Sequence, residues 1–157
     1  MDADLRNSVL HNLGVLAVGG VFALIGRGVD VLLGLPRITV GAALPIGIAL
    51  ALAGFLVRVW ATVAFYRRGM DVISLAPQAA LFTSGPYRYS RNPLYLGGNV
   101  FVFLGTSMIA QSLGGVLLTA LNVVLLNAWM IPREERQLAA RFGDEWTRYC
   151  AEVRRWL

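Results

Sequence analysis

From Val40 to Phe65 the chain reads VGAALPIGIALALAGFLVRVWATVAF, and Arg58 is the one charged side chain in this stretch. An α-helix rises about 1.5 Å per residue, so crossing roughly 30 Å of hydrocarbon takes about 20 apolar residues. This stretch is long enough to cross a bilayer and overhang it. Further apolar runs at about 9–33, 94–110 and 113–131 predict three more crossings, of which the last two are only just long enough.

The composition also indicates a membrane protein. Of 157 residues, 57% are hydrophobic and 15% are charged, and the mean hydropathy is +0.62. In a soluble domain about a quarter of the residues are charged. Because the length suits one unit, we predict an all-α integral membrane protein with a single membrane domain over 1–157. It would have four transmembrane helices plus a C-terminal amphipathic cytoplasmic helix.

The net charge of +5 comes with arginine as the only basic residue type apart from one histidine. In a soluble protein such basicity would suggest nucleic acid as a partner. Here the arginines sit at the ends of apolar runs, where anionic headgroups and the positive-inside rule account for them. We therefore expect membrane lipids and no nucleic acid as partners.

The arginines also orient the four predicted spans. Most fall on one side: Arg6, Arg67, Arg68, Arg88, Arg91, Arg133, Arg136, Arg141, Arg148, Arg154 and Arg155. Arg37 and Arg27 fall on the other side. The positive-inside rule then places both termini and the long middle segment in the cytoplasm. We expect a multi-pass protein of a prokaryotic inner membrane.

Few side chains are available for a metal or a disulfide. Cys150 is the single cysteine, and His11 lies alone near the N-terminus with no partners at ligand spacing. We therefore expect no metal and no disulfide within the chain.

Three ionisable residues fall within or near the predicted spans. Arg58 is close enough to the cytoplasmic end of its span to snorkel toward the interface. Arg27 and Asp30 are three residues apart on one helical face and can pair. The pair is either an ion pair at the outer interface or a group that faces substrate.

A first polar segment, 79–98, breaks the helical pattern. Gly85-Pro86 is a turn signal, and Pro93 suits the first turn of a helix that Asn92 can cap. Tyr95 followed by Gly97-Gly98 leaves an aromatic wall beside bare backbone, with room for a flat ligand. The alternative is that the tyrosines form an interfacial aromatic belt and the arginines bind headgroups.

A second segment, 132–149, reads as an amphipathic helix on the cytoplasmic face. Its large apolar residues recur at three- and four-residue spacing, and they are Leu138, Phe142, Trp146 and Tyr149. Glu134 and Glu135 fall in its first turn. They either complement the helix dipole and pair with nearby arginines, or bind a cofactor.

These two segments resemble the isoprenylcysteine carboxyl methyltransferase and phospholipid methyltransferase group. The matching residues are Thr83-Ser84-Gly85-Pro86-Tyr87, then Arg91-Asn92-Pro93-Leu94-Tyr95-Leu96-Gly97, then Glu134-Glu135 with Leu138, Phe142-Gly143 and Tyr149. The resemblance covers roughly Leu81 to Tyr149. It is carried by the order of the two motifs with one helical hairpin between them.

The resemblance implies an integral membrane methyltransferase that binds S-adenosyl-L-methionine in a cytoplasm-facing pocket and methylates a lipid or hydrophobic small molecule. The implied cofactor-binding residues are Ala79, Ala80, Leu81 and Phe82 from a strand-like segment, then Tyr87, Asn92, Pro93, Leu94, Tyr95, Gly97 and Glu134. The candidate catalytic residues are Arg91, Asn92 and Glu134. No protein nucleophile is needed, since the enzyme aligns the reactants and excludes water.

Two positions depart from the carboxyl methyltransferases. Asn92 stands where those enzymes usually have histidine, and an amide cannot titrate. Met130 stands where they carry an arginine thought to meet the substrate carboxylate. A prenylcysteine carboxylate is therefore disfavoured, and a lipid amine, a thiol or another small hydrophobic nucleophile is at least as well suited. The alternative functions are an NADPH-dependent membrane reductase of the sterol reductase type and a non-enzymatic membrane scaffold.

Overall fold

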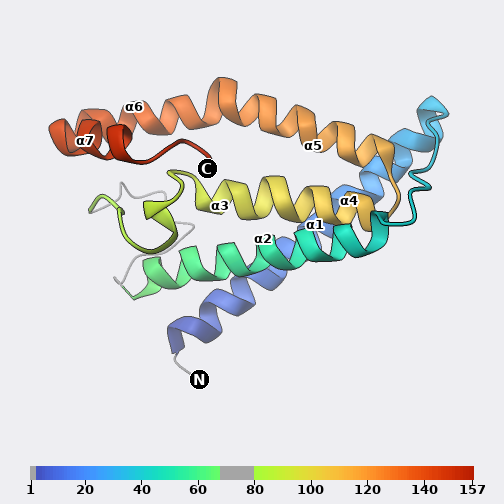
Figure 1. Ribbon diagram of the computed structural model, residues 1–157, viewed down its shortest axis with the longest axis horizontal. Coiled ribbons are helices and arrows are strands. Elements are labelled where there is room, and N and C mark those ends of the chain that lie inside the picture. The colour runs from blue at the N-terminus through green and yellow to red at the C-terminus, as the bar shows by residue number, and fades with distance from the viewer. Residues whose placement is uncertain (1–2, 68–79) are drawn as a thin grey trace.

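The structure, a computed structural model, describes residues 3–67 and 80–157, and these residues are helical with irregular connections and no strands (Figure 1). The first two helices are α1 (Ala3–Leu33) and α2 (Ala43–Tyr66). A short 3₁₀ helix, η1 (Gly85–Arg88), precedes the next long element. The described residues therefore agree with the predicted all-α class.

Two longer helical runs are each built from three segments. The third helical run joins α3 (Pro93–Tyr95), the π-helical η2 (Leu96–Val102) and α4 (Phe103–Ile109). The fourth helical run joins α5 (Leu113–Leu125), the π-helical η3 (Leu126–Met130) and α6 (Ile131–Phe142). The last helix is α7 (Asp144–Glu152). π-Helical segments were not predicted, because hydrophobic periodicity does not distinguish them from α-helix over one or two turns.

Three of the described helices are long and apolar enough to cross a membrane. They are Ala3–Leu33, Ala43–Tyr66 and Leu113–Phe142. The run Pro93–Ile109 is also apolar but shorter. By length and composition the chain is therefore a membrane protein.

Small residues let the helices approach closely. A Cβ atom added at Gly97 would lie 2.7 Å from the Gly54 carbonyl oxygen of α2, and one at Gly105 would lie 2.6 Å from the Gly47 carbonyl oxygen. Such backbone-to-backbone contact is typical of helix association in membranes, where dispersion contacts replace the hydrophobic effect. It fixes the third helical run against α2.

The predicted pairing of Arg27 with Asp30 is confirmed. Arg27 Nη1 donates to Asp30 Oδ2 at 2.8 Å, and Asp30 Oδ1 accepts from the Gly114 backbone N–H at 2.5 Å. Asp30 is 2% exposed, and its carboxylate receives a donor at the start of α5. The pair therefore caps the fourth helical run from α1, at the end of the molecule opposite the polar segments (Figure 1).

The prediction that Arg58 snorkels to the interface is wrong. Its side chain is 9% exposed and turns inward, where Nε donates to Asn12 Oδ1 and Nη1 donates to the Leu94 carbonyl oxygen, each at 2.8 Å. Gly97 and Gly98 leave the space that the side chain occupies. Acceptors within reach inside the protein outweigh the pull of the interface.

The C-terminal segment 132–149 is two helices rather than one. The backbone of Gly143 has a φ of 50°, which ends α6 and begins α7 in a new direction. α6 in turn continues the fourth helical run without a break. The apolar spacing predicted one helix because it runs through the glycine in step with the helical period.

Candidate functional site

The polar segments meet at one end of the molecule. Figure 1 shows the loop before α3, the helices α6 and α7 and the C-terminal residues at the same end, far from the turn between α4 and α5. Gly85, with a φ of 63°, starts η1 and turns the chain back toward α2. The predicted turn at Gly85-Pro86 is thus confirmed.

An aromatic cluster anchors this loop to the end of α2. The rings of Phe65 and Phe82 stack with their centroids 4.2 Å apart, and Tyr87 packs against both. Leu81 belongs to a neighbouring cluster with Trp146. The segment that holds Leu81 and Phe82 is irregular rather than strand-like, and both side chains are buried in packing.

A cavity of about 100 Å³ lies between the start of the third helical run and α6. Its lining residues are Phe65, Tyr87, Arg91, Asn92, Pro93, Leu94, Tyr95, Glu134, Glu135, Leu138 and Trp146. Across it, the Tyr95 hydroxyl donates to Glu134 Oε1 at 2.6 Å. The cavity therefore combines aromatic walls, one carboxylate held by a phenol, and a nearby guanidinium.

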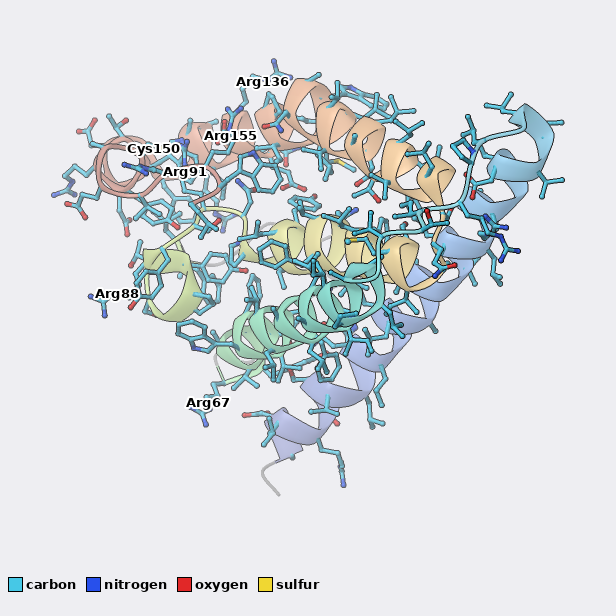
Figure 2. The ribbon with its side chains drawn as sticks, turned by 45° about the vertical axis from the view of Figure 1, so that its right-hand side comes forward. Arg67, Arg88, Arg91, Arg136, Cys150 and Arg155 are labelled. Atoms are coloured by element: carbon cyan, nitrogen blue, oxygen red, sulfur yellow. The ribbon has the colours of Figure 1, made fainter. Side chains whose placement is uncertain are left out.

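Arg91 lies at the edge of this cavity. Its Nη1 is 3.4 Å from Glu135 Oε1 and also contacts Cys150 Sγ, and its guanidinium carbon is 5.7 Å from the centroid of the Trp146 ring. Figure 2 shows Arg91 gathered with Cys150 and Arg155, whereas Arg88 and Arg136 point outward. Arg91 Nε is buried and has no hydrogen-bond partner in the described part of the chain. Arg91, which lines the cavity, therefore has one buried donor whose hydrogen-bonding capacity is not used by the described residues.

The residues after α7 return to the cavity and bind its loop. The backbone N–H of Arg91 donates to the Arg154 carbonyl at 2.9 Å, and Asn92 Nδ2 donates to the Arg155 carbonyl at 3.0 Å. The Arg155 guanidinium pairs with Glu135 through two hydrogen bonds. Asn92 therefore stands at the N-cap position as predicted, but its side chain holds the C-terminal segment instead of capping the helix.

The α7 helix is tied to η1 by Tyr149. Its hydroxyl donates to the Tyr87 carbonyl oxygen at 2.6 Å. Burial raises the pKa of Tyr149 to about 12 and also raises the pKa of Tyr87. Both phenols are therefore neutral at physiological pH. Tyr149 also lines an open groove of about 710 Å³, together with Arg88 and Arg148.

The structure brings together most of the predicted site residues, which are Tyr87, Arg91, Asn92, Pro93, Leu94, Tyr95 and Glu134. Ala80 is exposed and does not line the cavity, nor do Leu81 and Phe82. Gly97 faces α2, where an added Cβ would lie 2.7 Å from Arg58 Cγ. Ala79 lies outside the described residues.

The sequence did not indicate Phe65 or Arg155 as parts of this site, and it offered Glu135 only as a partner of nearby arginines or a cofactor-binding carboxylate. Phe65 belongs to an apolar run and carries no signal of its own. Glu135 adjoins the predicted Glu134, and its pairing with Arg155 joins residues 20 positions apart. The chain reaches this contact by turning at Gly143 and again at the extended Val153 after α7.

Comparison with known proteins covers the part of the chain that holds Tyr95 and Glu134. A family model described as phospholipid methyltransferase matches residues 42–145, more than half of the chain. A protein of Haemophilus influenzae, described as an uncharacterized protein, is 36% identical over 66 residues, which are 41% of this chain and the whole of that protein. No solved structure matches. The chain therefore belongs to the phospholipid methyltransferase family and is a membrane methyltransferase.

Proposed function

We propose that the chain transfers a methyl group from S-adenosyl-L-methionine to a hydrophobic or membrane-embedded acceptor, and that the cofactor binds at the cavity between Tyr95 and Glu134. The hydrogen bond between these two residues is the observation that carries the proposal. It holds a carboxylate beside aromatic rings in a half-buried setting. That environment suits a cationic sulfonium with a flat adenine.

The side chains present fit the cofactor in chemistry. Tyr87, Tyr95 and Trp146 supply aromatic surface, and Glu134 supplies a negative charge. The buried and unpartnered Arg91 Nε can donate to the carboxylate of the methionine moiety. A donor without a partner is uncommon in native structures, and a ligand accounts for it.

The cavity is smaller than the cofactor. Its volume of about 100 Å³ compares with roughly 300 Å³ or more for sites that enclose ligands of this size. Binding therefore requires α6, α7 and the C-terminal residues to move away from the loop. The contacts that resist this movement include those of Glu135 with Arg91 and Arg155, and the hydrogen bonds of Tyr95 to Glu134 and of Tyr149 to the Tyr87 carbonyl.

The chain's own residues would bind the cofactor and the acceptor, orient them and exclude water. When bound, the cofactor would supply an electrophilic methyl group to the lone pair of the acceptor, with its sulfur as the leaving group. Glu134 and the aromatic walls hold the reacting groups in line, and closure of α7 keeps water out. Asn92 keeps donor and acceptor capacity but cannot take a proton, so an acceptor that arrives with a free lone pair is favoured.

The acceptor is proposed to be a lipid amine, a thiol or another small hydrophobic nucleophile. Met130, at the end of η3, is 47% exposed and offers no charge to a substrate carboxylate. A nucleophile without a carboxylate therefore suits this surface better than a prenylcysteine. An apolar acceptor would enter from the bilayer, between the third and fourth helical runs.

The proposed topology has four crossings and a cytoplasmic site. Pro93–Ile109 is apolar and packs against α2 and α1, so we place it in the membrane as the fourth crossing element. The arginine asymmetry then puts the cavity, both termini and the amphipathic α6 and α7 on the cytoplasmic side of a prokaryotic inner membrane. Cysteine-scanning accessibility on each side of the membrane tests this orientation.

Titration of detergent-purified protein with S-adenosyl-L-methionine, S-adenosylhomocysteine and NADPH tests the cofactor. Calorimetry should show micromolar binding of the first two ligands, and Glu134→Ala and Tyr95→Ala should abolish it. Tyr89→Phe, at a tyrosine that is 58% exposed, is the matched control and should bind as wild type does.

Other outcomes select the other functions. Binding of NADPH alone would select a reductase. If a folded sample binds none of the three ligands, a scaffold role would remain. If the cofactor binds, incubation of lipid extracts with a labelled methyl donor, followed by mass spectrometry, identifies the acceptor.

A further inference from the structure

A buried polar cluster lies beneath the cavity, between α1, α2 and the third helical run. It consists of Ser8, Asn12, Arg58 and Thr62, all between 0% and 9% exposed. Asn12 Nδ2 donates to Thr62 Oγ1 at 2.8 Å, the hydroxyls of Ser8 and Thr62 share a short hydrogen bond, and Arg58 Nε donates to Asn12 Oδ1. This cluster takes no part in the function proposed above.

Arg58 carries a charge with no carboxylate partner in the described part of the chain. Its hydrogen bonds go to an amide oxygen and a backbone carbonyl. A buried cation without an opposite charge costs several kcal/mol, so its presence calls for a reason. Helix adhesion does not supply one, because the small residues Gly54 and Gly97 already bring the backbones together.

The second acceptor of Arg58 is part of the cavity wall. Nη1 donates to the carbonyl oxygen of Leu94, and that carbonyl belongs to the peptide unit that leads into Tyr95. Tyr95 in turn donates to Glu134 on α6. A continuous route therefore runs from Asn12 through Arg58 and the Leu94–Tyr95 peptide to Glu134, and it joins four helical elements.

We propose that Arg58, oriented by Asn12, is a positioning residue that fixes the Leu94–Tyr95 peptide and so aims the Tyr95 hydroxyl at Glu134. The guanidinium is suited to this task because its planar fork reaches two acceptors on different helices in one fixed geometry. Asn12 holds the Arg58 guanidinium in this orientation, because the Asn12 amide nitrogen itself donates to Thr62 Oγ1 and to the Ser8 carbonyl oxygen. The inference rests on the proposed function only in that Glu134 then receives the cofactor.

Through Asn12, α1 would have a role at the site. Residue 12 lies outside the part of the chain that the family model matches, which begins at residue 42. α1 would then set the geometry of a cavity that none of its residues lines.

A readout that needs no cofactor tests the positioning. The five tyrosines are replaced biosynthetically by 3-fluorotyrosine, and the resonance of Tyr95 is assigned from its absence in Tyr95→Phe. Asn12→Ala and Arg58→Lys should each shift or broaden this ¹⁹F resonance. Thr106→Val is the matched control. Thr106 Oγ1 donates to the Gly19 carbonyl at 2.9 Å, so this variant removes another side-chain hydrogen bond between the third helical run and α1. The Tyr95 resonance should stay in place in this variant.

A double-mutant cycle on S-adenosylhomocysteine affinity adds a second readout. Asn12→Ala and Tyr95→Phe should each weaken binding, and the double variant should bind at least about fivefold more tightly than the product of the two effects predicts. The double variant of Thr106→Val and Tyr95→Phe should show the affinity that the product of the two separate effects predicts.

The outcomes separate the two proposals. An unchanged Tyr95 resonance in both Asn12→Ala and Arg58→Lys overturns the positioning role, as does independence of Asn12 and Tyr95 in the cycle. If wild-type protein binds no S-adenosylhomocysteine, the proposed function fails, and the resonance alone then decides the positioning role. Arg58→Lys keeps the charge, so a sample that folds is expected even if Asn12→Ala does not.

Discussion

The Tyr95 hydroxyl donates a 2.6 Å hydrogen bond to Glu134 Oε1, across 39 positions of sequence. It links the first turn of the third helical run to the first turn of α6, and both residues line the same cavity. A phenol that donates to a carboxylate favours its charged form. Burial raises the pKa of Glu134, and the hydrogen bond from Tyr95 opposes that shift while it fixes the carboxylate at the point where we propose that a cation binds.

Replacement of Tyr95 by phenylalanine removes this bond while it keeps the ring. Hydrogen bonds to charged groups contribute about 1.5–3 kcal/mol, so S-adenosylhomocysteine should bind about tenfold more weakly or worse. Calorimetry measures the change, with Tyr89→Phe as the control at an exposed tyrosine. Equal affinity in the two variants would contradict the role given to the Tyr95 hydroxyl.

The double pairing of Glu135 predicts an order of stabilities. Glu135→Gln weakens the contacts to both Arg91 and Arg155, whereas Arg155→Gln weakens only one of them. Because these groups are partly exposed, we expect losses on the order of 1 kcal/mol, larger for Glu135→Gln. Thermal unfolding in detergent measures both, and Glu145→Gln, at an exposed position of α7, is the control. The reverse order would mean that the C-terminal segment is held by other contacts.

Two glycine-to-alanine substitutions should act in opposite directions. Gly97→Ala drives a methyl group against Arg58 and the Gly54 carbonyl, and overpacking of this kind costs about 1–3 kcal/mol. Gly14→Ala meets nothing within 4 Å, and alanine improves helix propensity by about 1 kcal/mol. Thermal unfolding should show the first variant below wild type and the second at or above it. A wild-type midpoint for Gly97→Ala would show that α2 and the third helical run can separate freely.

Alkaline pH should loosen α7 through Tyr149. Burial raises the pKa of this phenol from 10.0 to about 12, so the neutral form is favoured in the folded state. The stabilisation is complete below pH 10 and is lost as the pH rises from 10 to 12, because the unfolded chain releases its proton first. Thermal midpoints across this range should fall less steeply in Tyr149→Phe than in wild type. Identical slopes would show that the hydroxyl is not buried against Tyr87.

The sequence predicted the helices well and the contacts between them poorly. Long apolar runs, the turn at Gly85-Pro86 and the helix start at Pro93 follow from local chemistry, and all three appear in the structure. The inward turn of Arg58 does not follow, because its acceptors lie on other elements. The sequence motif assigned Gly97 to cofactor binding, but the space that a side chain there would fill is occupied by Arg58.

The candidate site was predicted in part for a similar reason. Tyr87, Asn92, Tyr95 and Glu134 stand in motifs with fixed spacing, and they line one cavity. The C-terminal residues that close the loop carry no local pattern. Their place depends on the backbone of Gly143, whose φ of 50° is reached at little cost only by glycine.

The π-helical segment η2 has a consequence for how this protein can change over time. A π turn uses one residue more than an α turn, so it acts as an insertion stored inside the helix. Loss of one residue between Leu96 and Val102 would restore α-helical geometry and leave Tyr95 and Gly105 close to their present faces, because the wide turn is what accommodates the extra residue. The same deletion inside a regular α-helix such as α2 would instead rotate the residues on one side of it by about 100°. The third helical run is therefore a place where this fold can lose one residue and still keep both its contact with α2 and the direction of the Tyr95 phenol.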